Sequence, residues 1–432
     1  MTPGAVPAGT ALDDAAGQRE QAHRAAVQRR TMGTLVAMQA SGNAAIASVV
    51  AVSSLLAADL LGGEALAGLG SAMFTAGAAL VAVPLAQHMR RRGRRPGLVM
   101  AYATAVVGAG LATTAGQVGS FPLFVVGLFL IGAGQAANLV GRYVAADLAL
   151  PDRRARAISI VVWTGTLGAV LGPTFATFEK DAAGSAGFNR LIGPLLFSGA
   201  YFVLAALVVA VFMRPDPLVV SGGLAAAGEP RVRRMVQVRS AFAVIRRFPG
   251  ARLGLIAVVI SQTTMVAVMT MTPLHMRDHG QADLSAFVIA LHIVGMYGLA
   301  PVVGIAADRL GRARVIQAGA AVLGLGTMVS VLAGYHPALI FTGLFLLGLG
   351  WSCGLIGGST LLTESVPIHD RVAVQGAADL LMGVSGALGA VISGLVKAQL
   401  GFHMLANGAT IAAVILLVTA TGARRAMAPA TR

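Results

Sequence analysis

The stretch LIGPLLFSGAYFVLAALVVAVFM at residues 191–213 contains no charged side chain and lies between Arg190 and Arg214. About 20 consecutive apolar residues are enough for one helix to cross the hydrocarbon core of a bilayer. The rest of the 432-residue chain is similar in kind: 56% of residues are hydrophobic, 11% are charged, and the mean hydropathy is +0.78. Because soluble proteins carry about 25% charged residues, this composition excludes a water-soluble globule and predicts a polytopic membrane protein.

Eleven more apolar segments of similar length follow one another along the chain. We therefore expect an all-α membrane protein with twelve transmembrane helices, six in each half. The predicted spans are 31–58, 63–87, 97–119, 121–146, 157–178, 191–213, 251–276, 284–306, 315–335, 337–362, 372–399 and 404–423.

The segments outside the spans predict the domain organisation. Residues 1–30 contain no apolar core, which predicts a mobile tail and not a cleaved signal peptide. Residues 31–213 and 251–423 form the two halves, residues 214–250 join them, and residues 424–432 form a second tail. In the linker, arginines alternate with apolar residues from Val232 to Phe248, as in an amphipathic helix on anionic headgroups or in a solvated basic linker.

The positions of the basic residues predict the orientation. Of 32 Lys and Arg residues, 27 fall in the two tails and in alternate connections, and four fall in the connections on the other side. Cytoplasmic loops retain positive charge, so both termini are predicted to be cytoplasmic, in a multi-pass protein of the inner membrane. The same clusters explain the net charge of +15 without nucleic acid as a partner.

Several enzyme classes lack their motifs in this sequence. It contains only two lysines, Lys180 and Lys397, and neither a GxxxxGK[ST] nor an HExxH motif. Cys353 is the single cysteine, so the sequence has no Cys-rich metal site. It also has no paired carboxylates and no His cluster of the kind that form a catalytic centre. We therefore expect no enzyme activity, no metal and no cofactor, with a proton gradient as the energy source.

The two halves repeat one another at an offset of about half the chain. RRRGRR at residues 90–95 and DRLGR at residues 308–312 each lie between the second and third spans of their half. In each half an acidic residue precedes an arginine by seven positions, and the run LGAV occurs at 167–170 and 388–391. Three matches in the same order predict two pseudo-symmetric bundles.

The segment from Gly304 to Arg312 reads G-x-x-x-D-R-x-G-R, which resembles the signature loop of the major facilitator superfamily. The resemblance implies two six-helix bundles around a central cavity and transport by alternating access. In the fifth span, Gly168, Gly172 and Pro173 resemble the motif of the drug:proton antiporter branch. Four positions depart from the family pattern: Arg90 replaces the first-half Asp, Leu128 replaces the Arg of span four, and Ala176 and Thr177 stand where the antiporter motif prefers glycine.

The resemblance also implies a latch of ion pairs on the cytoplasmic side. Arg94 is expected to pair with Asp147 and Arg312 with Glu364, while Asp308 caps the fifth span near residue 157. Pro173 is expected to bend that span. The alternative is that these residues only fix the topology. The candidate gating residues are Arg94, Asp147, Arg154, Asp308, Arg309, Arg312, Glu364 and Arg371.

Charges inside spans cost about 2.5–3.5 kcal/mol on insertion scales, so Arg142 and Asp379 are candidates for function. Gln135, Asn138 and Arg142 share one face of the fourth span. The candidate cavity residues are Gln39, Asn43, Gln135, Asn138, Arg142, Gln262, Met265, Met269 and Trp351, and the candidates for proton coupling are Asp379, Arg142 and His292. The alternatives are that Arg142 reaches the headgroups, that Asp379 and Arg142 form a static pair, and that His292 only packs.

These features together predict a monomeric transporter in the lipid bilayer that exports small amphipathic molecules in exchange for protons, as in multidrug efflux. One alternative is uptake of a metabolite by symport or facilitated diffusion. A second alternative, from another class, is a membrane sensor or scaffold without transport.

Overall fold

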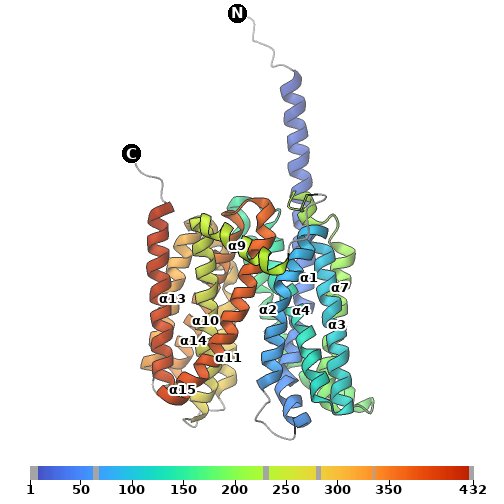
Figure 1. Ribbon diagram of the computed structural model, residues 1–432, viewed down its shortest axis with the longest axis vertical. Helices are drawn as coiled ribbons and strands as arrows, with labels where there is room; N and C mark the ends of the chain where they lie inside the picture. Colours follow the sequence, from blue (N-terminus) through green and yellow to red (C-terminus); the bar gives the residue numbers. More distant parts are fainter. Residues whose placement is uncertain (1–7, 62–67, 227–232, 279–283, 334–335, 428–432) are drawn as a thin grey trace, which may run out of the picture.

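A computed structural model describes residues 8–61, 68–226, 233–278, 284–333 and 336–427, and every regular element in these residues is helical (Figure 1). The first half contains α1 (Ala8–Leu61), α2 (Gly68–Arg92), α3 (Arg94–Val118), α4 (Phe121–Ala146), η1 (Pro151–Arg153), α5 (Arg154–Trp163), α6 (Gly165–Ser185), η2 (Arg190–Ile192) and α7 (Gly193–Phe212). The linker contains α8 (Pro217–Val220) and α9 (Arg234–Arg247). The second half contains α10 (Pro249–Asp278), α11 (Ser285–Ile293), a π-helical turn η4 (Val294–Gly298), α12 (Ala300–Leu310), α13 (Arg312–Leu332), α14 (Pro337–Glu364) and α15 (Ile368–Met427).

The predicted twelve spans are present in this architecture. Ten helices of the described residues are long and apolar enough to cross a membrane. One of them, α15, contains two spans, because its backbone turns at Gly401 with a φ of 83°. The fifth span consists of α5 and α6 and is not among the ten. The protein is therefore an all-α, multi-pass membrane protein.

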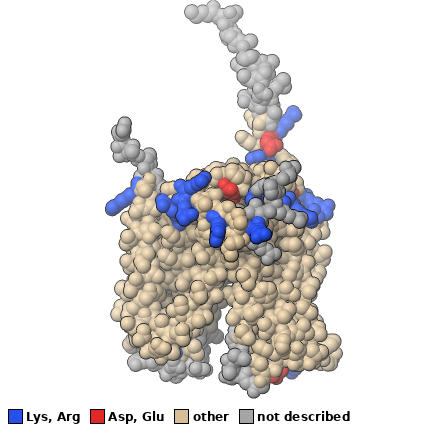
Figure 2. Space-filling model, viewed as in Figure 1, with Lys and Arg blue, Asp and Glu red and all other residues tan. Residues whose placement is uncertain are grey.

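The spans form two bundles, with α1 to α7 in one and α10 to α15 in the other (Figure 1). Both termini lie at the same end, and most of the visible Lys and Arg side chains gather there (Figure 2). We call this end the basic end. Figure 2 shows a hollow between the bundles at the opposite end, which we call the open end.

The bundles contact each other mainly along two helix pairs, α2 with α15 and α5 with α12. Each pair contains a glycine that packs against the partner helix. A methyl group added to Gly304 would meet Ser159 of α5, and one added to Gly376 would meet Ala86 of α2. Small residues allow helix backbones to pack closely in lipid, where apolar side chains gain little by leaving the tails.

The internal repeat is visible in the backbone. Gly93 follows α2 with a φ of 99°, and Gly311 follows α12 with a φ of 98°, a region that favours glycine. Arg154 donates to the carbonyl of Ala149 five residues earlier, and Arg371 likewise donates to the carbonyl of Val366. Equivalent turns therefore occur at equivalent places in both halves.

The expectation of a mobile tail over residues 1–30 is wrong for the part that the structure describes. Residues 8–30 are helical and continuous with the first span, so α1 projects beyond the bundle at the basic end (Figure 1). Alanine favours helix, and Arg24 pairs with Glu20 one turn away at 2.9 Å. Gln28 joins this arm to α4 by donating to the carbonyl of Ala145 at 2.8 Å. Residues 1–7 lie outside the described chain.

The linker contains the amphipathic helix that the sequence predicts, but its apolar face contacts protein. Ala241 and Ile245 of α9 are buried in the second bundle, and Phe242 packs beside them. Met235 and Val236 remain exposed at the start of the helix. Part of α9 is therefore bound to the bundle, and its first turn is free to meet headgroups.

The fifth span is interrupted at another place than Pro173, and the bend expected at Pro173 stays a prediction. Helix α6 continues through Pro173, and the break lies nine residues earlier, between Trp163 and Gly165. There the hydroxyl of Thr164 bonds to the carbonyl of Val161 and competes for a helical acceptor, and Gly165 is a weak helix former. Proline removes a single backbone donor, which neighbouring helices in a membrane protein tolerate.

Candidate functional site

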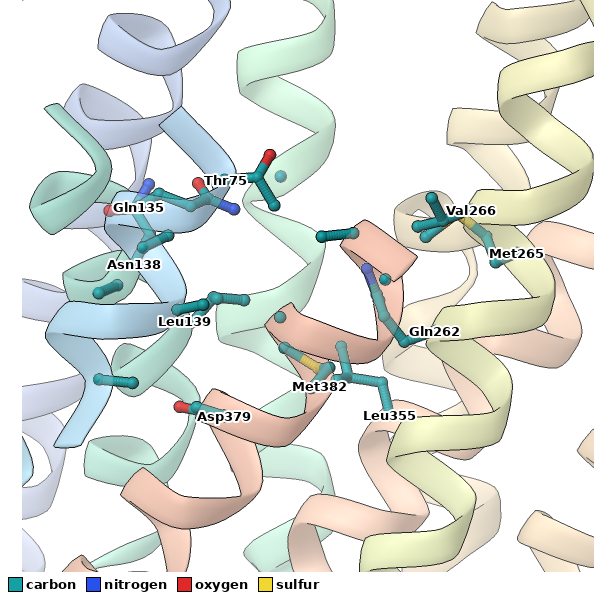
Figure 3. A pocket seen from close by; sticks show the side chains of 18 of the residues that line it. Thr75, Gln135, Asn138, Leu139, Gln262, Met265, Val266, Leu355, Asp379 and Met382 are labelled. Atoms are coloured by element: carbon teal, nitrogen blue, oxygen red, sulfur yellow. The ribbon is translucent and has the colours of Figure 1, made fainter. Parts of the chain in front are cut away.

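A cavity of about 690 Å³ lies between the two bundles. Its lining includes eight of the nine predicted cavity residues, namely Gln39, Asn43, Gln135, Asn138, Arg142, Gln262, Met265 and Trp351, together with Asp379. Side chains of both bundles face one another across this space (Figure 3). Cavities of about 300–1,000 Å³ bind drug-sized molecules.

An ion pair in the lining of the cavity joins the two bundles. Arg142 of α4 pairs with Asp379 of α15, and both side chains are at most 3% exposed. The Arg142 guanidinium also donates to the Ser359 hydroxyl of α14 at 3.0 Å and to the Tyr143 hydroxyl at 3.2 Å. Arg142 therefore does not reach the headgroups. The Oδ2 atom of Asp379 has no hydrogen-bond partner among the described residues.

The wall contributed by the first bundle is rich in amides. Asn138 receives a hydrogen bond from the Tyr102 hydroxyl at 2.5 Å and donates to Asn43 at 3.0 Å. Gln39 donates to the backbone carbonyl of Asn138 at 2.8 Å, which leaves its own Oε1 atom without a partner in the described structure. The face predicted from Gln135, Asn138 and Arg142 does line the cavity, and Figure 3 shows Gln135 and Asn138 on it.

The wall contributed by the second bundle is aromatic and rich in methionine. Trp351 donates its indole N–H to Gln262 at 2.8 Å and packs edge-on against Tyr297, with ring centroids 5.6 Å apart. Met265, Met296 and Met382 complete this wall. The cavity thus offers amide groups on one side and a polarisable apolar surface on the other.

The sequence reasoning missed several lining residues, including Phe74, Thr75, Met296, Tyr297 and Met382. Tyr297 lies in the π-helical turn η4, which locally changes the helical period. The part of the lining that α2 contributes could have been predicted from the sequence. Its small residues recur at helical spacing and all line the cavity, namely Ala72, Thr75, Ala79 and Ala82.

Two predicted residues lie elsewhere. Met269 packs against the core of the second bundle and is not part of the cavity lining. His292 is buried between α11 and α14, with its Nδ1 atom 2.7 Å from the carbonyl oxygen of Leu344. This position favours the alternative that His292 is a packing residue.

The predicted pair of Arg94 and Asp147 is present at the basic end. Arg94 binds the carboxylate through two bonds, Nε to Oδ2 at 2.8 Å and Nη2 to Oδ1 at 3.1 Å. The same guanidinium donates to Gln375 of α15 at 2.7 Å, which connects the bundles. Because Arg94 is 1% exposed, this network is shielded from water.

The second half contains the equivalent latch. Arg312 donates to Glu364 at 3.0 Å and reaches the backbone carbonyl of Pro151 in the other bundle. Asp308 accepts hydrogen bonds from the backbone N–H groups of Ala155 at 3.1 Å and of Arg156 at 2.9 Å. The predicted cap is therefore present, at a helix that begins at Arg154 and not at residue 157.

The remaining candidates for gating take different places. Arg154 lies 3.9 Å from Glu364 across the bundles. Arg371 donates to the carbonyl of Val366 in its own loop. Arg309 is exposed on α12. Gly168 of the predicted antiporter motif packs against Asn43 of α1, and the contacts of Gly172 and Pro173 fall outside the described residues.

Known proteins are similar to both halves of this chain. The sequence model of the Major Facilitator Superfamily matches residues 33–299 and again residues 253–430. Two uncharacterized MFS-type transporters of Bacillus subtilis, YddS and YdeG, are 35% and 37% identical, each over 90% of this chain and 89% and 90% of their own. The riboflavin transporter RfnT of Brucella anthropi is 28% identical over 83% of this chain and 86% of its own. Among solved structures, the transporter FucP in the outward conformation superposes with a TM-score of 0.70 at 14% identity, over 91% of this chain and 98% of its own.

Proposed function

This chain belongs to the Major Facilitator Superfamily and is a membrane transporter, and we propose that it exports small amphipathic molecules in exchange for protons. The observation that carries the proposal is the cavity between the bundles, which ends at the pair of Arg142 and Asp379. A site that is accessible from one end and sealed at the other is what alternating access requires.

The orientation follows from the charge distribution. We assign the basic end to the cytoplasm, because 27 of the 32 basic residues lie in the tails and connections assigned to that side and cytoplasmic loops retain positive charge. The cavity then opens outward in this conformation, and the latches of Arg94 and Arg312 hold the cytoplasmic side closed. Both termini lie in the cytoplasm under this assignment.

The two walls of the cavity support an amphipathic substrate without net charge. Arg142 and Asp379 are the charged residues of the described lining, and they neutralise each other. Amides of one wall would bind polar edges, while Trp351, Tyr297 and the methionines would contact an apolar face. Export in particular is supported by the resemblance of Gly168, Gly172 and Pro173 to the antiporter motif.

A second candidate is transport of a flavin-like metabolite, which the 28% identical relative named as a riboflavin transporter favours. A flavin has a flat aromatic body with hydrogen-bonding edges, and the two walls would suit such a shape. The comparisons give no support to a sensor or scaffold without transport.

The test uses inverted membrane vesicles that contain the protein and are acidified inside by respiration. An exporter coupled to protons should accumulate a fluorescent substrate, either ethidium or riboflavin, and release it when a protonophore is added. Vesicles with Asp379→Asn serve as the matched control and should lose at least nine-tenths of the accumulation. Uptake confined to right-side-out vesicles with acid outside would overturn export and support symport.

A further inference from the structure

A third carboxyl group is buried away from the cavity. Glu179 lies on α6, one residue beyond the predicted end of the fifth span, and is 0% exposed. Its backbone packs against Gly193, which begins α7 toward the open end. The side chain lies in the seam between α1, α6 and α7, and it is not part of the cavity lining.

Only neutral groups contact this carboxyl group in the described structure. The Ser48 hydroxyl of α1 donates to Oε1 at 2.9 Å, and the Tyr201 hydroxyl of α7 interacts with the same carboxyl. The other oxygen, Oε2, has no hydrogen-bond partner among the described residues. Tyr201 lies eight residues into α7, about 12 Å along the helix axis from Gly193.

The neighbouring charged residues form no described ion pair with Glu179. Lys180 and Asp181 follow on the same helix, and Asp181 pairs with Arg190 of η2 at an exposed position. No described Arg, Lys or His lies within ion-pair distance of Glu179. From α1 and α7, Ser48 and Tyr201 are the polar groups that face it.

Asp379 and Glu179 therefore face opposite situations. Asp379 has the Arg142 guanidinium beside it as a compensating positive charge. An ionised Glu179 would be an isolated charge in an apolar seam, and such a group becomes neutral instead of paying the full cost of burial.

We propose that Glu179 is a proton-binding site, separate from the cavity, that is occupied in the conformation with the open end accessible. The proton adds to the carboxylate to give a carboxylic acid, and it leaves when the seam of α1, α6 and α7 admits water. Low pH thus favours the present conformation, and high pH favours the conformation in which Glu179 is hydrated. This inference rests on the proposed proton coupling, because it supplies a carboxyl that is loaded from the open side.

The experiment measures conformation directly and needs no substrate. Val118 of α3 and Leu332 of α13 end at the open end in different bundles and are exposed, so Val118→Cys and Leu332→Cys can carry spin labels in a Cys353→Ser background. Distance distributions are recorded in nanodiscs from pH 5 to pH 9 by electron–electron double resonance. In the labelled protein that keeps Glu179, we expect the fraction of molecules with an accessible open end to fall at least threefold as the pH rises from 5 to 9.

Glu179→Gln keeps the shape of the protonated side chain and removes its titration. We expect this variant to retain the low-pH distribution at every pH. The matched control is Asp181→Asn, two residues along the same helix, which should titrate as the parent does. Ser48→Ala removes a donor to the carboxylate and should move the midpoint to higher pH.

Two outcomes would overturn the proposal. One is a Glu179→Gln variant whose distance distributions change with pH as the parent's do. The other is an infrared comparison at low pH in which the carboxylic acid carbonyl band of the parent is not reduced by Glu179→Gln. This readout needs no spin label, so it holds even if the labelled variants fold poorly. If Glu179 titrates as expected but pH gradients drive no transport in vesicles, the proton-coupled function fails and the proton site stands.

Discussion

At the scale of single residues, Arg142 and Asp379 depend on each other, because each is a buried charge supplied by a different bundle. Removing one partner of a buried ion pair costs about 3–5 kcal/mol, since it leaves the other charge uncompensated. We therefore expect Asp379→Asn to lower the free energy of unfolding by about 3 kcal/mol. The measurement is denaturant unfolding of the purified protein in one detergent.

A double-mutant cycle separates the pair from its neighbours. Combining Asp379→Asn with Arg142→Gln removes both charges, so we expect most of the lost stability to return while transport stays absent. Asp181→Asn breaks an exposed pair with Arg190 and should change stability by less than about 0.5 kcal/mol. A double variant as unstable as the sum of the two singles would contradict a direct interaction.

The residues of this site show how far sequence reasoning reaches. Gln135, Asn138 and Arg142 could be predicted to share one face, because the helical period fixes their relative directions. The partners Ser359 and Gln375 could not be predicted, since the register between two bundles depends on packing across the whole interface. Glu179 was missed because the charged run from 179 to 181 looks like the end of a span.

At the scale of elements, the first turn of α5 depends on a cap from the opposite bundle. Asp308 accepts two backbone N–H bonds there, and its negative charge also complements the helix dipole. Asp308→Asn should weaken the closed basic end by about 1 kcal/mol, which is roughly a fivefold change in population. Labelling rates of a cysteine placed at Arg156 would report the opening.

Asp152→Asn is the control for this cap. Asp152 lies in the preceding η1 turn, is exposed, and lies 3.7 Å from Arg153 in its one ion pair among the described residues. Its replacement should leave the labelling rate unchanged. An Asp308→Asn rate equal to that of Asp152→Asn would show that the cap does not hold the bundles together.

The elements themselves were predictable wherever uncharged runs were long enough to span the bilayer. The break in the fifth span was not, because the proline pattern pointed to residue 173 while a threonine hydroxyl bond and a glycine act at 164 and 165. The helical arm of α1 was missed for a related reason: a polar composition resembles that of a disordered tail even when alanine favours helix.

At the scale of the whole molecule, the two contacts between bundles should determine the conformational equilibrium. A larger side chain at Gly304 or Gly376 would collide with Ser159 or Ala86 and push the basic end apart. We expect Gly304→Leu to shift the protein toward the conformation open at that end by at least tenfold. Paired spin labels on α5 and α12 at the basic end would measure the separation.

Gly110→Leu is the matched control, because a methyl group at Gly110 would meet nothing within 4 Å. It should leave the distances unchanged. If Gly304→Leu retains the closed distance and only lowers the melting temperature, the contact is structural and not part of a moving interface.

The architecture of two bundles was predictable from the repeat, since Gly93 and Gly311, and Arg154 and Arg371, do adopt equivalent conformations. The conformation that the structure shows was not predictable from the sequence. A protein that alternates between two packings needs a sequence that is compatible with both.

The arm of α1 has a practical use. A 43.7 kDa transporter enclosed in a lipid particle offers few features by which electron micrographs can be aligned. Since one unbroken helix runs from the interior of the first bundle to well beyond the basic end, a small folded protein grafted in helical phase onto it would be held at a fixed angle. Such a graft would serve as a rigid pointer for imaging the working cycle.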